Sequence, residues 1–441
     1  MRFRHVMAAL VPAGAAAALA IVPAGASSAA HAVAAAGHVT PAASSPLAYR
    51  YVGKASGSGF LFSCQEPGAA LNCYTPRELA TAYDIPGKLT GAGQTIVIID
   101  AFGDPAVTQD LGVEDTTFGL PGANLSVIYP NGRPAFDPAN ADELNWSGEI
   151  ALDVESAHAI APAAKIDLVI AKTDNDPDIL SALQYVVAHR LGSVLSQSFG
   201  EAESCEAPAI AAADHVLFAA AAAQGVTVFA SSGDDGAAQP TCDGSSFIQS
   251  ASLPAADPLV TGVGATSLTA SQPDGAYQSE AAWNDEFGSS GGGYSKVFPR
   301  PAYQNGFVSG GGRGEPDVSY SGDVNNGLLI AWSQGDPANV GNIFLFGGTS
   351  AGSPQWAAIA ALADQNAHRR LGFINGDLYS LGHGARSAAV FHDVTTGNNT
   401  ASLTDRSGNP VNIAGYPATK GWDPVTGLGA PDVAHLLQYL R

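Results

Sequence analysis

Charge is scarce in this chain, and positive charge is the scarcest. Only 13% of the 441 residues are charged, and 40 Asp and Glu stand against 19 Lys and Arg, which gives a formal net charge of −21. A protein of this charge repels polyanions, so nucleic acids and anionic membranes are not expected as partners. The shortage of bases also leaves few carboxylates in ion pairs. Such a protein loses little stability when its carboxylates are protonated, which suits an acidic medium.

Long apolar runs are missing after the N-terminus, so we expect no membrane anchor. The one apolar run, residues 6–22, follows two arginines and precedes small-residue sites that end at Ala26 and Ala32. This pattern is typical of a secretory signal peptide over residues 1–32, cleaved after Ala26 or Ala32. A transmembrane anchor is the alternative, but it would need about 20 apolar residues. The sequence therefore predicts a secreted, extracellular protein.

Cysteine is rare, with four in the whole chain. An even number in an exported protein indicates two disulfides. Three connectivities are open, and the simplest joins Cys64 to Cys73 and Cys205 to Cys242. The second bridge would tie together two loops beside the site described below.

The rest of the chain indicates one large domain. Residues 33–72 predict a short leader or linker with no full pro-domain, and a folded domain is expected over residues 73–441. After about residue 285 the chain is rich in glycine and is expected to be looped. Continuous apolar strands that alternate with helices predict an α/β fold, a doubly wound and mostly parallel sheet with helices on both faces. The expected strands are 94–100, 125–129, 166–171, 193–198, 226–230 and 259–263, and the expected helices are 75–83, 143–160, 179–191 and 208–223.

One serine stands at the mouth of a buried helix. Two glycines and a threonine precede Ser350, and the small, apolar run 354–363 follows it with proline in the expected first helical turn. A serine held there can face nearby backbone N–H groups, as a nucleophile requires. The alternative is an ordinary helix N-cap, which serine often provides.

Acidic residues gather on two further elements. Glu149 and Asp153 are four residues apart on a largely apolar helix, so they share one face. The alternative is a solvated acidic face, although a buried carboxyl pair is a functional candidate. Asp234 follows the strand at 226–230, where parallel sheets bind ligands, and the alternative is an ordinary Asp-Gly turn, which this motif alone favours. The strand end Ser198, Phe199 and Gly200 could pair with an extended peptide.

Two C-terminal aspartates lie in loops rich in Gly, Asn and Thr. Asp393 and Asp423, with nearby carbonyl oxygens, offer the oxygen-only ligands that calcium prefers. Ordinary turns are the alternative for both loops.

Together these segments resemble the sedolisin family, the serine-carboxyl peptidases, which are similar in fold to subtilisin. The resemblance extends over residues 73–441. It rests on several short motifs in the family's order, which are Thr75-Pro76 with Tyr83, and residues 99–105, 149–153, 232–234, 291–295, 298–304, 316–319, 348–350 and 421–424.

The resemblance implies a role for each candidate residue. Ser350 would be the nucleophile, Glu149 its general base, Asp153 the partner that holds Glu149, and Asp234 a protonated oxyanion donor. One structural calcium ion would be bound by Asp393 and Asp423 with the carbonyls of Val394, Thr419 and Gly421. The family often has glycine where Thr419 stands, which a carbonyl ligand tolerates.

The resemblance thus implies a secreted, acid-acting serine peptidase that cleaves proteins or peptides, as an endopeptidase rather than a tripeptidyl-peptidase, and a monomer is expected. A protonated Asp234 requires acid pH, since only the neutral acid can donate to an oxyanion. Two alternatives remain open at this point. One is a His-dependent, subtilisin-like hydrolase that uses His158, and the other is a catalytically silent protein that binds peptides.

Overall fold

The computed structural model describes residues 48–441, apart from 56, 58–60, 67, 68 and 70. The predicted signal peptide, residues 1–32, and the leader up to residue 47 lie outside this part. Within it, every helix is too short or too polar to cross a membrane.

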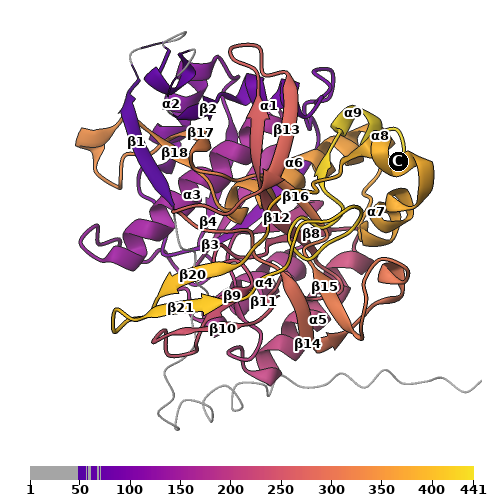
Figure 1. The fold of residues 1–441 in the computed structure, drawn as a ribbon. Coiled ribbons are helices and arrows are strands. Elements are labelled where there is room, and N and C mark those ends of the chain that lie inside the picture. The colour runs from indigo at the N-terminus through magenta and orange to yellow at the C-terminus, as the bar shows by residue number, and fades with distance from the viewer. Residues whose placement is uncertain (1–47, 56, 58–60, 67–68, 70) are drawn as a thin grey trace, which may run out of the picture. The chain divides into compact units, whose positions relative to one another are not determined.

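A mostly parallel sheet of eight described strands carries the fold (Figure 1). Its strands follow the spatial order β13-β12-β8-β6-β3-β5-β4, and β16 pairs with β12. Only the pair of β12 and β13 is antiparallel, so the predicted α/β class is confirmed. The strands are β3 Thr95–Ala101, β4 Asn124–Ile128, β5 Lys165–Ala171, β6 Val194–Gln197, β8 Thr227–Ser231, β12 Thr261–Ala270, β13 Tyr277–Ala282 and β16 Val318–Ser321.

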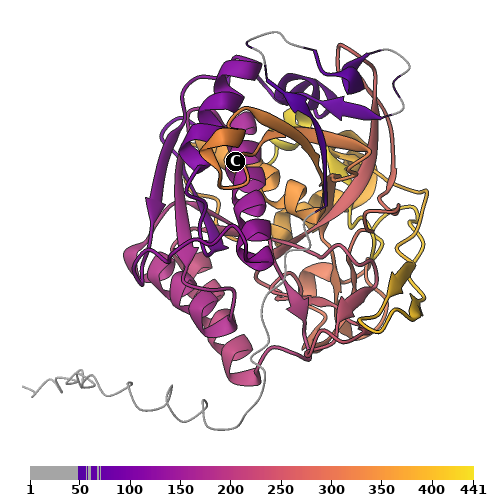
Figure 2. The same ribbon diagram turned by 90° about the vertical axis from the view of Figure 1, so that its left-hand side faces the viewer.

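Helices cover both faces of this sheet, as Figure 2 shows from the side. The strand β3 explains the arrangement, because its side chains alternate between two cores. Ile96 and Ile98 join the core beneath α3 and α6, whereas Val97 and Ile99 join the core beneath α4 and α5. The helices are α1 Pro76–Ala82, α2 Val107–Phe118, α3 Ala141–Ile160, α4 Asp176–His189, α5 Pro208–Ala223, α6 Thr349–Ala367, α7 Asn375–Gly382, α8 Ser387–Val390 and α9 Val433–Leu436.

Several helices differ from the prediction, and α7, α8 and α9 lie in the region after residue 285 that was expected to be looped. Sequence pattern did not predict α2, whose glycine, threonines and valines are weak helix formers. The helix α6 begins at Thr349 rather than at Pro354, so proline lies in the second turn and not in the first. Tertiary packing overrides the local cost of proline, since nearly every residue of α6 up to Asp364 is buried.

Strands also occupy regions that were expected to be loop or linker. β1 Tyr49–Lys54 and β2 Asn72–Tyr74 form a four-stranded sheet with β17 Asn326–Ala331 and β18 Asn342–Phe346. Their partners are distant in sequence, so local composition did not reveal them. Shorter strand pairs are β7 Glu201–Ala202 with β11 Ser252–Leu253, β9 Ala238–Pro240 with β10 Phe247–Gln249, β14 Gly293–Pro299 with β15 Gly312–Glu315, β19 Phe391–His392 with β22 Ala430–Pro431, and β20 Ala401–Thr404 with β21 Pro410–Ile413.

Two disulfides join Cys64 to Cys73 and Cys205 to Cys242. The first lies in the core of the four-stranded sheet. The second ties the loop after β7 to the loop after β9, beside the site described below.

Several buried carboxyls make stability depend on pH. Burial raises the pKa of Asp104 and Glu280 to about 7 and that of Glu315 to about 8. In the unfolded chain these groups titrate near pH 4, so between about pH 4 and pH 8 the folded state binds more protons. Their stabilising contribution is therefore complete below about pH 4 and is lost as pH rises through the folded pKa values. We expect Tm to fall by on the order of 10 °C from pH 4 to pH 8.

Thermal unfolding in buffers of matched ionic strength measures this effect. The Glu280 carboxyl accepts hydrogen bonds from Tyr83 and Thr266, and an amide oxygen can accept both. Glu280→Gln should therefore flatten the decline, whereas Glu286→Gln, at an exposed side chain, should leave it unchanged. A Tm that stays level or rises over this interval would contradict the prediction.

Candidate active site

Ser350 is the second residue of α6, at the helix N-terminus, where the helix dipole is positive. Its N-cap is Gly348, so the alternative of Ser350 as an N-cap is wrong. Gly348 has φ +91°, and a Cβ there would lie 2.5 Å from Oδ2 of Asp234. Only glycine fits this position, because the turn must be left-handed and must pass close to a carboxyl.

Because of Pro354, the backbone carbonyl of Ser350 in the first turn of α6 has a hydrogen-bond partner outside the helix. A residue at this position would normally donate its N–H to the carbonyl of Ser350, and proline has none. Instead Oγ of Ser198 donates to that carbonyl at 3.5 Å, and Oγ of Ser350 donates to the carbonyl of Ser198 at 3.4 Å. The end of β6 is thereby held against the first turn of α6.

Three carboxyls are fully buried behind this contact. Glu149 and Asp153 lie on α3, and Asp100 lies near the end of β3. Burial raises the pKa of Asp153 well above its usual range, the nearby carboxyls of Asp100 and Glu149 raise it further, and contact with the Ser198 hydroxyl opposes them. Burial and Glu149 likewise raise the pKa of Asp100. Such a cluster retains protons that exposed carboxyls would lose.

Asp234 is fixed by the residue that precedes the serine. The backbone N–H and the hydroxyl of Thr349 donate to Oδ1 of Asp234 at 2.7 and 2.8 Å. Burial raises the pKa of Asp234 to about 6, and the two hydrogen bonds from Thr349 limit the rise. Asp234 therefore changes its charge within the mildly acidic range.

Ser350 and Asp234 line one hollow. Of the predicted peptide-binding residues, Ser198 and Gly200 line it, while Phe199 turns to the other core and contacts the ring of Trp146 at 6.0 Å between centroids. The lining consists of Ser198, Gly200, Ser231, Gly233, Asp234, Asp235, Gln239, Ser252, Thr349 and Ser350.

Some of these residues were not predicted from the sequence. Asp100, which lies behind the hollow, is the last residue of the expected strand 94–100, and Thr349 directly precedes the serine, so the sequence contained a signal for both. Gln239 and Ser252 come from short strands that give no such signal, and only the fold brings them to the hollow.

His158 does not belong to this hollow. Its Nε2 lies 2.9 Å from the carbonyl of Pro121 and 2.9 Å from Oδ1 of Asp115 on α2. The residues that line the hollow include Ser350 but no histidine. The geometry therefore does not support the His-dependent alternative.

The predicted calcium ligands lie on two adjacent segments. The N–H of Gly421 donates to both carboxylate oxygens of Asp393 at 3.0 and 3.1 Å. Oδ2 of Asp423 accepts from the N–H of Thr419 at 2.8 Å, and its Oδ1 accepts from the N–H groups after it. Val394, which would offer a carbonyl, directly follows Asp393. The donor set is entirely oxygen, as calcium prefers.

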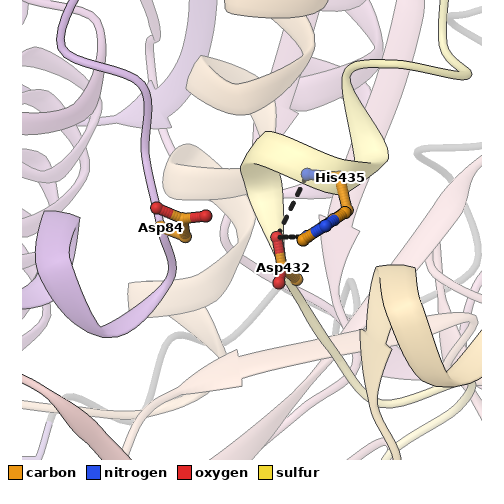
Figure 3. A group of neighbouring side chains, drawn as sticks. All are labelled: Asp84, Asp432 and His435. Carbon is orange, nitrogen blue, oxygen red and sulfur yellow. Dashed lines mark hydrogen bonds and ion pairs between the residues drawn. The ribbon is translucent and has the colours of Figure 1, made fainter.

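A different group satisfies the distances of a metal site among the described residues. Figure 3 shows Asp84 facing Asp432 and His435, whose possible ligand atoms lie within 4.8 Å of one another. Asp432 already caps α9, since its Oδ1 accepts from the N–H of His435 at 3.1 Å and lies 2.8 Å from Nδ1. These contacts require no ion, and we assign none.

A serine at a helix N-terminus, a buried acidic cluster behind it and an acid facing it on a parallel sheet define a serine-carboxyl type of site. No family model matches the chain. It is 36% identical over 402 residues to kumamolisin of Bacillus sp. (strain MN-32). This alignment covers 86% of this chain and 66% of kumamolisin. It is 31% identical over 362 residues to a probable tripeptidyl-peptidase of Arthroderma benhamiae. This alignment covers 73% of this chain and 57% of the relative.

The fold can also be compared with that of a solved structure. Pseudomonas sedolisin, a serine-carboxyl proteinase complexed with two molecules of pseudo-iodotyrostatin, superposes with a TM-score of 0.71 at 30% identity, and the match covers 84% of this chain and 98% of that one. The chain belongs to the sedolisin family. It spans just under two thirds of the length of kumamolisin.

Proposed function

We propose that this protein is a secreted serine-carboxyl peptidase that hydrolyses peptide bonds at acid pH through an acyl-enzyme. One observation carries the proposal: Ser350 and a buried acid, Asp234, line the same hollow while Ser198 links the serine to buried Asp153. Membership of the sedolisin family supports the reaction class, and the two disulfides suit an oxidising, extracellular medium.

In the proposed mechanism Glu149 acts as the base. Oγ of Ser350 attacks the substrate carbonyl carbon while the Glu149 carboxylate takes the hydroxyl proton. Glu149 then gives this proton to the leaving amine, which departs as the acyl-enzyme forms. Water attacks the ester next and gives a proton to Glu149. Glu149 passes this proton to Oγ of Ser350 as the ester bond breaks and the acyl group leaves as a carboxylic acid. Asp153 holds Glu149 and retains a proton within the pair, which suits a cluster whose pKa values burial raises.

Asp234 stabilises the tetrahedral intermediate in this mechanism. Thr349 occupies Oδ1, so Oδ2 is the oxygen that can carry a proton toward the hollow. A neutral acid donates a hydrogen bond to the oxyanion, whereas a carboxylate repels it. The proposal therefore requires a pH below the Asp234 pKa of about 6.

The substrate is proposed to be an extended peptide that lies along Ser198–Gly200. Endopeptidase action is the simpler form, because a peptide held there needs no group that recognises a chain terminus. The tripeptidyl-peptidase among the relatives defines the alternative. The lengths of products released from a denatured protein would distinguish the two modes.

Asp393 and Asp423 fit a structural calcium ion together with the carbonyls of Val394, Thr419 and Gly421. The fit rests on the all-oxygen donor set and on the contact that joins the two segments. The ion would stabilise the loops and would supply no chemistry to the reaction.

The nucleophile and base can be tested by conservative substitution. Ser350→Ala and Glu149→Gln should each lower kcat/KM by about 10⁴ or more with little change in Tm, since nucleophile and base act as one unit. Glu155→Gln is the matched control, because Glu155 is buried on the same helix but contacts the N–H of Ala331. Cleavage of a denatured protein at pH 3–5, an order-of-magnitude window set by carboxyl titration, is the measurement.

Full activity in either folded variant would remove that residue from its role. An unmodified, folded protein that binds peptides but cleaves none would favour the catalytically silent alternative.

The charge of Asp234 should set part of the alkaline limit of peptidase activity. The kcat/KM value should fall as pH rises through about 6, where Asp234 ionises. Asparagine donates a hydrogen bond at every pH, so Asp234→Asn should retain more activity than Asp234→Ala, and its limit should move to higher pH. Thr349→Val removes a donor that lowers the Asp234 pKa, and it should move the limit in the same direction.

The comparison between variants is decisive, because other carboxyls titrate in the same range and the measured limits belong to the whole cluster. Equal impairment of the Asn and Ala variants, with an unmoved limit, would rule out the oxyanion role.

Chelation tests the calcium proposal without reference to activity. Excess EDTA should lower Tm by several degrees, roughly the effect of removing a ligand that binds only the folded state, and added calcium should restore it. Asp393→Asn should show the lower Tm and ignore EDTA, whereas Asp405→Asn, in another exposed loop, should behave like the unmodified protein. An unchanged Tm in a sample known to contain calcium would refute the site.

A further inference from the structure

The hollow that contains Ser350 is lined by polar residues and glycine. Its described lining carries hydroxyl, carboxyl and amide groups, with no aliphatic or aromatic side chain and no base. The polar groups nearest the proposed chemistry have partners in the protein, since Ser198 is bonded to Ser350 and Thr349 to Asp234. Three further side chains line the same hollow and are referred to below as the open polar groups: Ser231, Gln239 and Ser252.

Ser252 is held in place while its hydroxyl is left unpaired. Its backbone N–H donates to Oε1 of Glu315 at 2.7 Å. Its side chain is fully buried and lines the hollow, and its Oγ has no hydrogen-bond partner among the residues that the structure describes. This Oγ lies against Gly200 of the proposed peptide-binding segment, where a Cβ would overlap it. A buried hydroxyl without a partner is rare, so Ser252 is suited to a hydrogen bond with a bound ligand.

Gln239 lies beside the loop that carries Asp234. Its Nε2 lies against Gly233, where a Cβ would overlap it. Gln239 is 4% exposed and lines the hollow, and within the described part of the chain no hydrogen bond involves its side-chain amide. The amide therefore keeps both donor and acceptor capacity for a ligand.

The second disulfide holds these two open polar groups near each other. Cys242 follows the strand β9 that carries Gln239, and Cys205 follows β7. The strand β7 pairs with β11, in which Ser252 lies opposite Ala202. The bridge thus ties together the two segments that present an amide and a hydroxyl to the hollow.

The carboxyls around the hollow supply little charge in the acid range. Asp234 and Asp235 line it, and burial raises their pKa values to about 6 and about 7. Both are therefore mostly neutral at pH 5 and below. Glu149 and Asp153 lie behind Ser350 and can add only negative charge.

A base lies near the hollow but is already paired. Burial raises the pKa of Glu315 to about 8, against the opposing charge of Arg313. Nη2 of Arg313 lies 2.6 Å from Oδ2 of Asp317, so its charge is compensated. A ligand side chain in the hollow would thus meet neutral hydrogen-bonding groups at acid pH, with neither a free cation nor a strong anion on the described lining.

These features select one kind of side chain. An apolar side chain would leave the open polar groups unpaired in a buried place. Lys and Arg only donate hydrogen bonds, so they cannot accept from Nε2 of Gln239. A carboxylate only accepts, and it would lose its solvation without gaining a cation. An amide both donates and accepts, and it is uncharged at every pH.

We propose that this hollow selects an uncharged amide side chain, Gln or Asn, on the substrate residue whose carbonyl is attacked. The proposal rests on the proposed peptidase function, because that carbonyl must lie between Ser350 and Asp234. The side chain of the same residue then enters the hollow that these two line. Its amide would hydrogen-bond to Gln239 and Ser252.

Cleavage of peptides that differ at one position tests the preference. Fluorescence-quenched peptides of one sequence would carry Gln, Met or Glu at that position, and product masses would locate the bond cut. Met has nearly the length and shape of Gln but lacks its hydrogen bonds. At pH 5 the kcat/KM value for the bond after Gln should be about tenfold higher than after Met, as expected for buried polar groups left unpaired.

The Glu peptide separates shape from charge. A Glu side chain has an ordinary pKa of about 4.3, so its neutral fraction rises about fivefold from pH 5 to pH 3.5. The ratio of kcat/KM for Glu to that for Gln should rise by about the same factor, because the neutral acid can both donate and accept. The ratio for Met to Gln should stay level. Each ratio cancels the effect of pH on the enzyme itself.

Variants locate the preference. Gln239→Met should reduce the ratio of Gln to Met cleavage to about one, and Ser252→Ala should reduce it in part. Gln249→Met, on the neighbouring strand β10, is the matched control, because its amide donates to the carbonyl of Ala414 and Gln249 is absent from the lining of the hollow. It should keep the preference of the unmodified protein. If Gln239→Met does not fold, Ser252→Ala and the Glu peptide still decide.

Three results would overturn the proposal: cleavage after Met or Glu at pH 5 that equals or exceeds cleavage after Gln, a Glu ratio that does not change with pH, or a folded Gln239→Met variant that keeps the preference. If the folded protein cleaves no peptide, the peptidase function fails. Binding of the Gln and Met peptides, measured by calorimetry at pH 5, then tests the hollow alone. Tighter binding of the Gln peptide supports the selection of an amide, and equal binding refutes it.

Discussion

The contact between the end of β6 and the first turn of α6 fixes the geometry of the site. Pro354 has no N–H to donate to the carbonyl of Ser350, and the hydroxyl of Ser198 donates to that carbonyl instead. The reciprocal bond from the Ser350 hydroxyl places that hydroxyl at the carboxyl end of the sheet. Gly348 must then pass so close to Asp234 that no side chain is tolerated. The hydrogen bond that α6 lacks at Pro354 is thus the feature that positions Ser350.

The second constraint on this molecule is that it buries carboxyl groups with few Lys or Arg residues to place beside them. Carboxyls lie in the interior at Asp100, Asp153 and Asp234, and in each case burial is the largest influence on the pKa. A chain with 19 Lys and Arg has few cations to place beside them. Its buried carboxyls must therefore share protons with one another or accept hydrogen bonds. The same shortage of bases makes the interior sensitive to pH.

The sequence predicted the parts of this structure that depend on local pattern. The strand at β3 and the helix at α5 were found almost to the residue, since apolar period and end signals both mark them. The strand β1 was missed because its partner β18 is remote in sequence, and pairing rather than composition makes it a strand. The glycines before Ser350 correctly indicated its position at the start of a helix. The helix was predicted to begin too late, because packing outweighs the local effect of Pro354.

The end of β6 presents alternate residues to opposite sides of the sheet, where they line different hollows. Ser198 and Gly200 face the proposed nucleophile, while Gln197 and Phe199 face the opposite core. The alternation of an extended chain assigns each residue to one side, so a change on one side need not disturb the other. The carboxyls that lie beside Gln197 and Phe199 come from α4, β7, the loop after β7 and α5, none of which supplies the serine or the buried acids behind it. Side chains on one face of β6 can therefore change while the contact of the other face with α6 stays fixed.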